Sequence, residues 1–211
     1  MLKRVTAVDA LADELRRQIL SGDLPPGSKL PEVELAGRFK VARPTVRSAL
    51  QRLVERGVLH RDTGRSAVVP ELSRADVRDV YFTREAVELH VVDHLTGSGR
   101  SLALLEPVRQ AVRRMEELPA GAEWSDSVEA DLAFHTALVA AAGSARLDRL
   151  FQGLLEEVRI CLVQLEAHYP RRADLAGEHR RILAALEAGD AATARELMRT
   201  HLDGAARALL G

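Results

Sequence analysis

Residues 30–59 read LPEVELAGRFKVARPTVRSALQRLVERGVL, and this stretch decides the fold of the first third of the chain. Its apolar residues recur every three to four positions, which predicts a short helix over residues 32–39 and a longer one over residues 43–56. Pro44 suits the first turn of the longer helix, where a missing N–H has no partner to lose. Gly57 suits its end. The stretch therefore predicts two helices separated by a tight turn.

The flanking sequence adds a third helix and a hairpin. Residues 8–20 carry apolar side chains at helical spacing, and residues 25–28, PPGS, form a rigid connector. After the second helix the period becomes that of strands, near residues 58–61 and 66–69. Three helices and a two-stranded wing predict a winged helix-turn-helix domain over residues 1–70.

The rest of the chain, residues 71–211, has helical periodicity to its end. Glycine, proline and serine clusters divide it into segments. We expect six helices, at about residues 74–96, 101–118, 126–142, 145–168, 171–188 and 190–209. Aromatic residues make up only 3% of the chain, which argues against a strand-rich fold. The predicted fold class is mainly α, with an N-terminal winged helix-turn-helix and a C-terminal all-α helical bundle.

The charge of the chain divides at the same boundary. The formal net charge is −1, but residues 1–70 carry a net charge of +5 and residues 71–211 a net charge of −6. This asymmetry indicates two domains with different partners. The basic domain suits the phosphates of DNA, whereas the acidic domain would be repelled by them.

The composition also limits the cellular compartments in which we expect the protein. Hydrophobic residues make up 46% of the chain, which excludes general disorder, and a single cysteine, Cys161, excludes a disulfide framework. The longest run without a charged residue, residues 132–145, is shorter than the ~20 apolar residues of a membrane span. Asp9, Asp13 and Glu14 stand where a signal peptide would be apolar. We expect a cytoplasmic protein with no membrane association.

The predicted helix over residues 43–56 is the one expected to enter the major groove of DNA. Arg43 and Arg47 share a face of its first turns, and arginine donates bidentately to guanine. The residues expected to read bases are Arg43, Thr45, Arg47 and Gln51. The residues expected to contact phosphate, or to let the wing approach the backbone closely, are Lys40, Gly64 and Arg65.

Four polar residues interrupt the apolar stripes of the C-terminal helices. Asp131 and His135 are one helical turn apart. His179 and His201 lie at nearly equal distances in sequence from the turn at Gly189-Asp190, so an antiparallel helix pair would place them level. Three nitrogens and one oxygen would suit Zn, ahead of Ni or Mn, and leave positions open for water or a ligand. The alternative is that each histidine is a satisfied core residue.

Arg84 and Glu88 also point inward, on the predicted helix at residues 74–96. A buried arginine must be paired, and Glu88, four residues on, is one candidate partner. Arg84 could instead clamp the carboxylate of an effector near the metal. The sequence leaves both interpretations open.

The N-terminal motifs resemble the DNA-binding domain of GntR-type bacterial transcriptional regulators. The resemblance covers about residues 8–70 and rests on LPEVELA at 30–36, VARPTVRSALQRL at 41–53 and ERGVL at 55–59. It implies that Arg43 and Arg47 stand at the DNA-contacting positions of the family.

The C-terminal part, about residues 73–209, is similar to the FCD-type ligand domain of the FadR subfamily of these regulators. The similarity rests on DLAFH at 131–135, EHRRI at 178–182 and MRTHL at 198–202. It implies a divalent metal, and a small carboxylate-type metabolite sensed beside that metal. Six helices would place the chain in the shorter, VanR-like group. The metal ligands implied by the resemblance are Asp131, His135, His179 and His201.

These observations predict a homodimeric, ligand-responsive repressor that binds operator DNA and is modulated by a small organic acid. One alternative is a metal-responsive regulator with no organic effector. Another is a metal-dependent hydrolase, because an open His/Asp site can activate water. The sequence contains no nucleophile motif, and its inward carboxylates are Glu88 and the ligand Asp131, so we expect no enzymatic activity.

Overall fold

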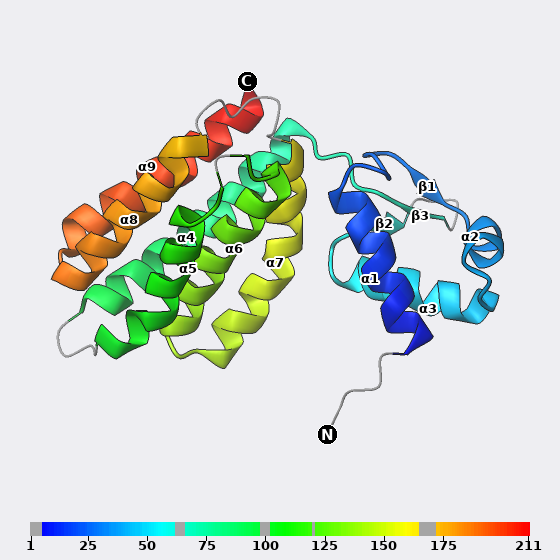
Figure 1. The fold of residues 1–211 in the computed structure, drawn as a ribbon, viewed down its shortest axis with the longest axis horizontal. Coiled ribbons are helices and arrows are strands. Elements are labelled where there is room, and N and C mark those ends of the chain that lie inside the picture. Colours follow the sequence, from blue (N-terminus) through cyan, green and yellow to red (C-terminus); the bar gives the residue numbers. More distant parts are fainter. Residues whose placement is uncertain (1–5, 62–65, 98–101, 120, 165–171) are drawn as a thin grey trace. The chain divides into compact units, whose positions relative to one another are not determined.

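The structure is a computed structural model that describes residues 6–61, 66–97, 102–119, 121–164 and 172–211. The chain divides into two compact units, Met1–Leu72 and Ser73–Gly211. Most of the described chain is helical (Figure 1), which confirms the predicted mainly-α class. None of the described helices is both long enough and apolar enough to cross a membrane.

The N-terminal unit packs three helices around one apolar core. Thr6 and Asp9 form a capping box at the start of the first helix, which satisfies backbone N–H groups there. The apolar faces meet over side chains that are almost completely buried, including Leu15, Val46, Ala49 and Leu53. The opposite face of the third helix, with Arg43 and Arg47, remains exposed. The three helices are α1 (Ala7–Leu20), α2 (Glu32–Phe39) and α3 (Arg43–Glu55).

The wing contains one strand more than the sequence predicted. Antiparallel strands β1 (Lys29–Leu30), β3 (Ala67–Val68) and β2 (His60–Arg61) lie in that order. The two-stranded prediction missed β1 because two residues are too few to show an alternating pattern. Leu30 is nevertheless 1% exposed and belongs to the core. The predicted turn at residues 62–65 lies outside the described residues.

Lys40 makes the corner between α2 and α3. Its φ of 53° is left-handed, the only positive φ at a non-glycine residue in the described part of the chain. The Lys40 N–H donates to the carbonyl of Ala36 and closes the end of α2. This corner sets the direction in which α3 leaves α2.

The C-terminal unit is an all-α bundle with six α-helices in its described residues. The predicted helix at residues 101–118 is wrong in one respect, because a 3-10 turn, Leu102–Leu105, precedes a shorter α-helix. Pro107 has no N–H to donate, so it fits the first turn of the shorter helix, where it stands, better than the interior of a longer one. The helices are α4 (Arg74–Thr96), α5 (Glu106–Glu116), α6 (Trp124–Ala141), α7 (Ala145–Gln164), α8 (Arg172–Ala188) and α9 (Ala191–Leu210).

Helix α4 packs along α9, and also contacts α6 and α7, while α8 and α9 form an antiparallel pair (Figure 1). Phe134 and Leu138 of α6 are fully buried. The core of this unit also contains polar side chains that are at most 8% exposed: Arg84, Glu88, Ser127, Asp131, His135, His179 and His201. Such burial is unfavourable unless each polar group has a partner, so these residues locate the candidate site.

Candidate functional site

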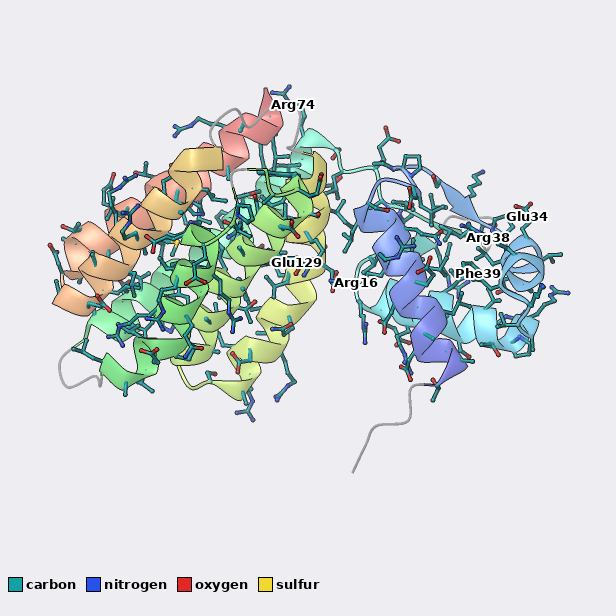
Figure 2. All side chains as sticks on the ribbon, viewed as in Figure 1. Arg16, Glu34, Arg38, Phe39, Arg74 and Glu129 are labelled. Carbon is teal, nitrogen blue, oxygen red and sulfur yellow. The ribbon has the colours of Figure 1, made fainter. Side chains whose placement is uncertain are left out.

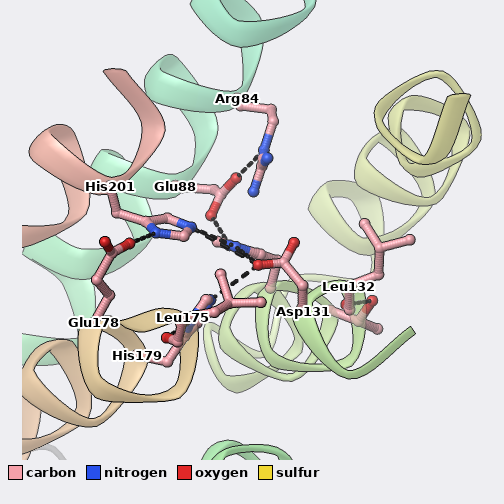
Figure 3. Close-up of polar contacts among 10 residues, drawn as sticks. Arg84, Glu88, Asp131, Leu132, Leu175, Glu178, His179 and His201 are labelled. Atoms are coloured by element: carbon pink, nitrogen blue, oxygen red, sulfur yellow. Dashed lines mark hydrogen bonds and ion pairs between the residues drawn. The ribbon is translucent and has the colours of Figure 1, made fainter. Parts of the chain in front are cut away.

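Asp131, His135, His179 and His201 meet inside the C-terminal unit, with one ligand atom from each lying within 4.8 Å of the others. Figure 3 shows Asp131, His179 and His201 pointing toward one another. Asp131 Oδ1 is 3.6 Å from His135 Nε2, 3.2 Å from His179 Nε2 and 3.9 Å from His201 Nε2. The Nε2 atoms of His135 and His201 are 3.2 Å apart. Ligands bonded tetrahedrally at ~2.0–2.1 Å would stand about 3.3 Å from each other, so this spacing suits one shared cation.

Two local features of the sequence create this arrangement. Asp131 and His135 are four residues apart on α6, so their side chains stack along one face. The turn between α8 and α9 contains Gly189 at φ 67°, and it brings His179 and His201 level, with ring centroids 4.5 Å apart. The geometric expectation from the sequence therefore agrees with the structure.

A second polar group fixes the orientation of each imidazole. His135 Nδ1 contacts a carboxylate oxygen of Glu88. His179 Nδ1 donates to the carbonyl oxygen of Leu175 at 2.8 Å, and His201 Nδ1 donates to Glu178 Oε2 at 2.9 Å. These contacts occupy the Nδ1 atoms and point all three Nε2 atoms toward Asp131, as the outer partners of metal ligands commonly do.

The electrostatics favour the metal-binding forms of His201 and Asp131, whereas for His135 burial would lower the pKa but the neighbouring Glu88 raises it. Burial, together with the neighbouring His179, lowers the pKa of His201 to about 4. Burial alone would raise the pKa of Asp131, but contacts with His135 and His179 hold it well below its usual value. His179 Nε2 is buried and lies 3.2 Å from Asp131 Oδ1, but it forms no hydrogen bond of good geometry with a described residue. The four ligand atoms converge, and a divalent cation would give each of them a partner, so the residues fit such an ion.

Arg84 and Glu88 are paired, as one interpretation of the sequence proposed. Arg84 Nε donates to Glu88 Oε1 at 2.8 Å, and both side chains are almost completely buried. The other oxygen of Glu88 contacts His135, a link that the sequence did not reveal. Arg84 Nη2 has no hydrogen-bond partner among the described residues. The pairing therefore leaves part of the guanidinium available, and the two interpretations do not exclude each other.

A small cavity joins Arg84 to the histidine cluster. Its volume is about 20 Å³, which is enough for roughly one water molecule. The lining combines polar groups with apolar walls: Arg84, Trp124, Ser127, Val128, Asp131, Leu162, Leu175, His201 and Ala205. Any ligand larger than water would have to widen this space.

The base-reading residues predicted on α3 differ in their surroundings. Arg43, at the start of the helix, is exposed and makes no hydrogen bond or ion pair with another described residue. Arg47 is 61% exposed but is held by two hydrogen bonds to Glu32. Thr45 is half-buried.

Gln51 connects α3 with the wing. Its Oε1 accepts from Arg61 Nη2 at 3.0 Å, and its Nε2 donates to Glu55 Oε1 at 3.1 Å. Both ends of the amide are therefore already engaged. Lys40 is exposed at the corner before α3, whereas the predicted contacts Gly64 and Arg65 lie outside the described residues.

Sequence reasoning missed Glu32, Arg61 and Glu178 as neighbours of the predicted sites. Glu178 had a recognisable signal, because it directly precedes His179. Glu32 stands in the first turn of α2, the helix before α3, where a carboxylate can face an arginine of α3. Arg61 offered only its position in the predicted wing.

Two protein-family models match the chain, one for each unit. The model described as "Bacterial regulatory proteins, gntR family" matches residues 7–69. The model described as "FCD domain" matches residues 79–204, more than half of the chain.

Three proteins, one of them with a solved structure, illustrate the similarity over almost the whole length of the chain. "HTH-type transcriptional regulator LutR" of Bacillus subtilis is 31% identical, over 92% of this chain and 96% of that protein. "Probable D-xylose utilization operon transcriptional repressor" of Paenarthrobacter nicotinovorans is 29% identical, over 95% and 88%. A transcriptional regulator GntR structure from Rhodococcus sp. RHA1 is 28% identical, with a TM-score of 0.83 and 97% of both chains covered.

Proposed function

The chain belongs to the GntR family of bacterial transcriptional regulators and carries an FCD domain, and from this we propose that it is a metal-containing, ligand-responsive repressor of the FadR subfamily. It is a regulator and not an enzyme. One observation carries the finer proposal. The buried cluster of Asp131 and three histidines adjoins a cavity into which an incompletely paired Arg84 projects.

The metal proposed is Zn, with Ni or Mn as substitutes. Asp131, His135, His179 and His201 would hold it, and their three nitrogens and one oxygen match the preferences of these ions. When bound, the ion would supply a positive charge and open coordination positions for an anionic oxygen. Glu88, Leu175 and Glu178 keep the imidazoles oriented toward it.

The effector proposed is a small organic acid. Arg84 Nη2 is buried without a hydrogen-bond partner in the described structure, and a carboxylate would satisfy it. The apolar side of the cavity, with Trp124, Leu162 and Leu175, would contact the rest of the molecule. Because the cavity holds roughly one water, the effector must bind a wider form of the unit. Binding that favours one form over another is what a regulatory signal requires.

The DNA-binding part of the proposal places α3 in the major groove. Exposed Arg43 and the outer edge of Arg47 would read bases, and Lys40 would contact phosphate. The net charge of +5 on residues 1–70 supports this role. The protein would act in the cytoplasm as a homodimer on an operator with two inverted half-sites.

A second candidate is a regulator that responds to the metal alone. The small volume of the cavity favours it, because the space beside the histidine cluster does not have room for an organic molecule. In this case binding and loss of the ion would be the signal.

One experiment separates the two candidates. The full chain would be purified with and without a chelator, and the metal content of each sample would be measured. The operator would be identified by selecting the fragments of the source genome that the protein binds. Operator binding would then be measured by fluorescence anisotropy with Zn, and with Zn plus a series of short mono- and dicarboxylates.

We expect one of the carboxylates to change the affinity for the operator, and to do so only in the metal-loaded protein. Trp124 is the only tryptophan of the chain and lines the cavity, so its fluorescence should change at the same concentrations. A response to Zn alone, with no carboxylate effect, would replace the first candidate with the second. Binding of no genomic fragment would contradict both.

A further inference from the structure

Glu32 of α2 forms an ion pair with Arg47 of α3, which is one of the residues predicted to read bases. Arg47 Nε donates to Glu32 Oε1 at 3.1 Å, and Arg47 Nη2 donates to Glu32 Oε2 at 2.9 Å. The contact is bidentate, along one edge of the guanidinium. Glu32 is the first residue of α2, where the helix dipole favours a negative charge, and it is only 21% exposed.

This contact leaves the other edge of Arg47 intact. A guanidinium has five N–H donors in one plane, and Glu32 uses one from Nε and one from Nη2. Two donors on Nη1 and one on Nη2 remain. The outer pair of Nη1 and Nη2 can still donate together to O6 and N7 of guanine. Glu32 therefore does not compete with a base for Arg47, but restricts the direction in which Arg47 points.

Glu32 also changes the charge of the surface around α3. The hydrogen bond from Arg47, with smaller contributions from Arg43 and Arg61, lowers the pKa of Glu32. The carboxylate, which any glutamate carries ionised at neutral pH, lies among the cations proposed to face DNA. An arginine without a partner can turn toward any nearby phosphate. An arginine that is paired with a carboxylate attracts a phosphate less strongly.

We propose that Glu32 is a positioning residue for sequence recognition, which holds the Nε edge of Arg47 so that its outer edge meets a guanine. The same contact prevents Arg47 from acting as a general phosphate contact. This inference rests on the DNA-reading role proposed for α3.

The test compares the full-length wild type with Glu32→Gln. Sequence preference would be read by selection from duplexes with a randomised central segment. Non-specific affinity would be measured on one arbitrary duplex at increasing KCl concentration. Glu32→Gln should lower discrimination for guanine at one position of each half-site by on the order of 5-fold to 150-fold. It should also tighten binding to the arbitrary duplex and steepen its log–log salt slope by about 0.9 for each further phosphate that the protein neutralises.

Glu34→Gln is the matched control. Glu34 lies on the same first turn of α2 (Figure 2), is exposed, and makes no hydrogen bond or ion pair with the residues that the structure describes. Its substitution removes the same charge without touching Arg47, so the selected sequence should not change. If the two variants shift preference and salt slope equally, net charge explains the effect and the proposal is overturned.

A double-mutant cycle with Arg47→Ala tests whether Glu32 acts through Arg47. In the Arg47→Ala background, Glu32→Gln should no longer change sequence preference. A change that persists there would mean that Glu32 acts on DNA by itself, and would overturn the proposal. Thermal melting should show folded variants, because an ion pair whose arginine is 61% exposed contributes little stability.

The outcomes separate this inference from the proposed function. A wild-type chain that selects a sequence, together with a Glu32→Gln variant that keeps the same preference, would overturn the inference alone. A wild-type chain that selects no sequence would overturn the proposed DNA reading and this inference with it.

Discussion

Glu88 on α4 contacts His135 on α6 through one carboxylate oxygen. Its other oxygen accepts a hydrogen bond from Arg84 (Figure 3). The buried carboxylate of Glu88 is therefore the polar partner of both the Arg84 guanidinium and His135, a candidate metal ligand. Its removal would leave two buried polar groups without their partner.

Glu88→Gln should therefore destabilise the C-terminal unit. Breaking a buried ion pair from one side commonly lowers the free energy of unfolding by about 3–5 kcal/mol. Urea unfolding in chelator, followed by Trp124 fluorescence, would measure the loss in this unit. Glu85→Gln is the control on the same helix, because Glu85 forms a partly exposed pair with Arg199, worth about 1 kcal/mol or less. Equal losses in the two variants would contradict the structural role of Glu88.

Replacing His179 or His201, two of the three inward-pointing histidines, should abolish metal binding. His179→Ala and His201→Ala each remove one nitrogen from the four-ligand cluster, and elemental analysis of the purified proteins would measure occupancy. His90→Ala, on the exposed face of α4, should keep the metal content of the wild type. A double variant, His179→Ala with His201→Ala, that retains the full complement of metal would disprove the site.

The metal-free protein should become less stable in mild acid because of His201. An unfolded imidazole takes up a proton near pH 6.5, whereas burial and the neighbouring His179 lower the pKa of folded His201 to about 4. Between these values the unfolded state binds more protons, so the free energy of unfolding falls as the pH is lowered. His201 would account for up to about 3 kcal/mol over this window. His201→Gln, unfolded by urea in chelator at several pH values, should show a shallower dependence; an unchanged slope would refute the assignment.

Arg43 and Lys40 should affect DNA binding in different ways. Arg43→Ala should reduce discrimination between the selected operator and altered sites, because Arg43 is free to contact a base edge. Lys40→Ala should weaken binding to all duplexes alike and reduce the salt slope by about 0.9. Anisotropy titrations over a range of KCl concentrations would measure both. The assignment of α3 as the reading helix fails if Arg43→Ala binds the operator with unchanged preference.

Much of the fold follows from short-range patterns in the sequence. The limits of α4, and the division of the C-terminal unit into helices, are encoded by apolar spacing and by residues that end helices. The level placement of His179 and His201 follows from the position of one turn. Strand β1 escaped prediction, because two residues show no periodicity and their pairing with β3 depends on chain folding.

The partners of the site residues could not be predicted in the same way. The contacts Glu88–His135 and Glu32–Arg47 each join two helices, and they depend on the angle and offset at which those helices pack. Spacing along one helix identified Glu88 as a neighbour of Arg84, since both lie on α4. It contained no information about a neighbour on α6.

Lys40 places stability and affinity in opposition at one position. A left-handed lysine is less favourable than a left-handed glycine by about 1 kcal/mol or more, so Lys40→Gly would relieve the corner between α2 and α3. The same change would remove the positive charge from this corner, which we propose contacts a DNA phosphate. A variant library sorted for thermal resistance should enrich glycine here, whereas one sorted for operator occupancy should retain lysine. The left-handed lysine at this corner would then indicate that selection has favoured DNA binding over folding stability.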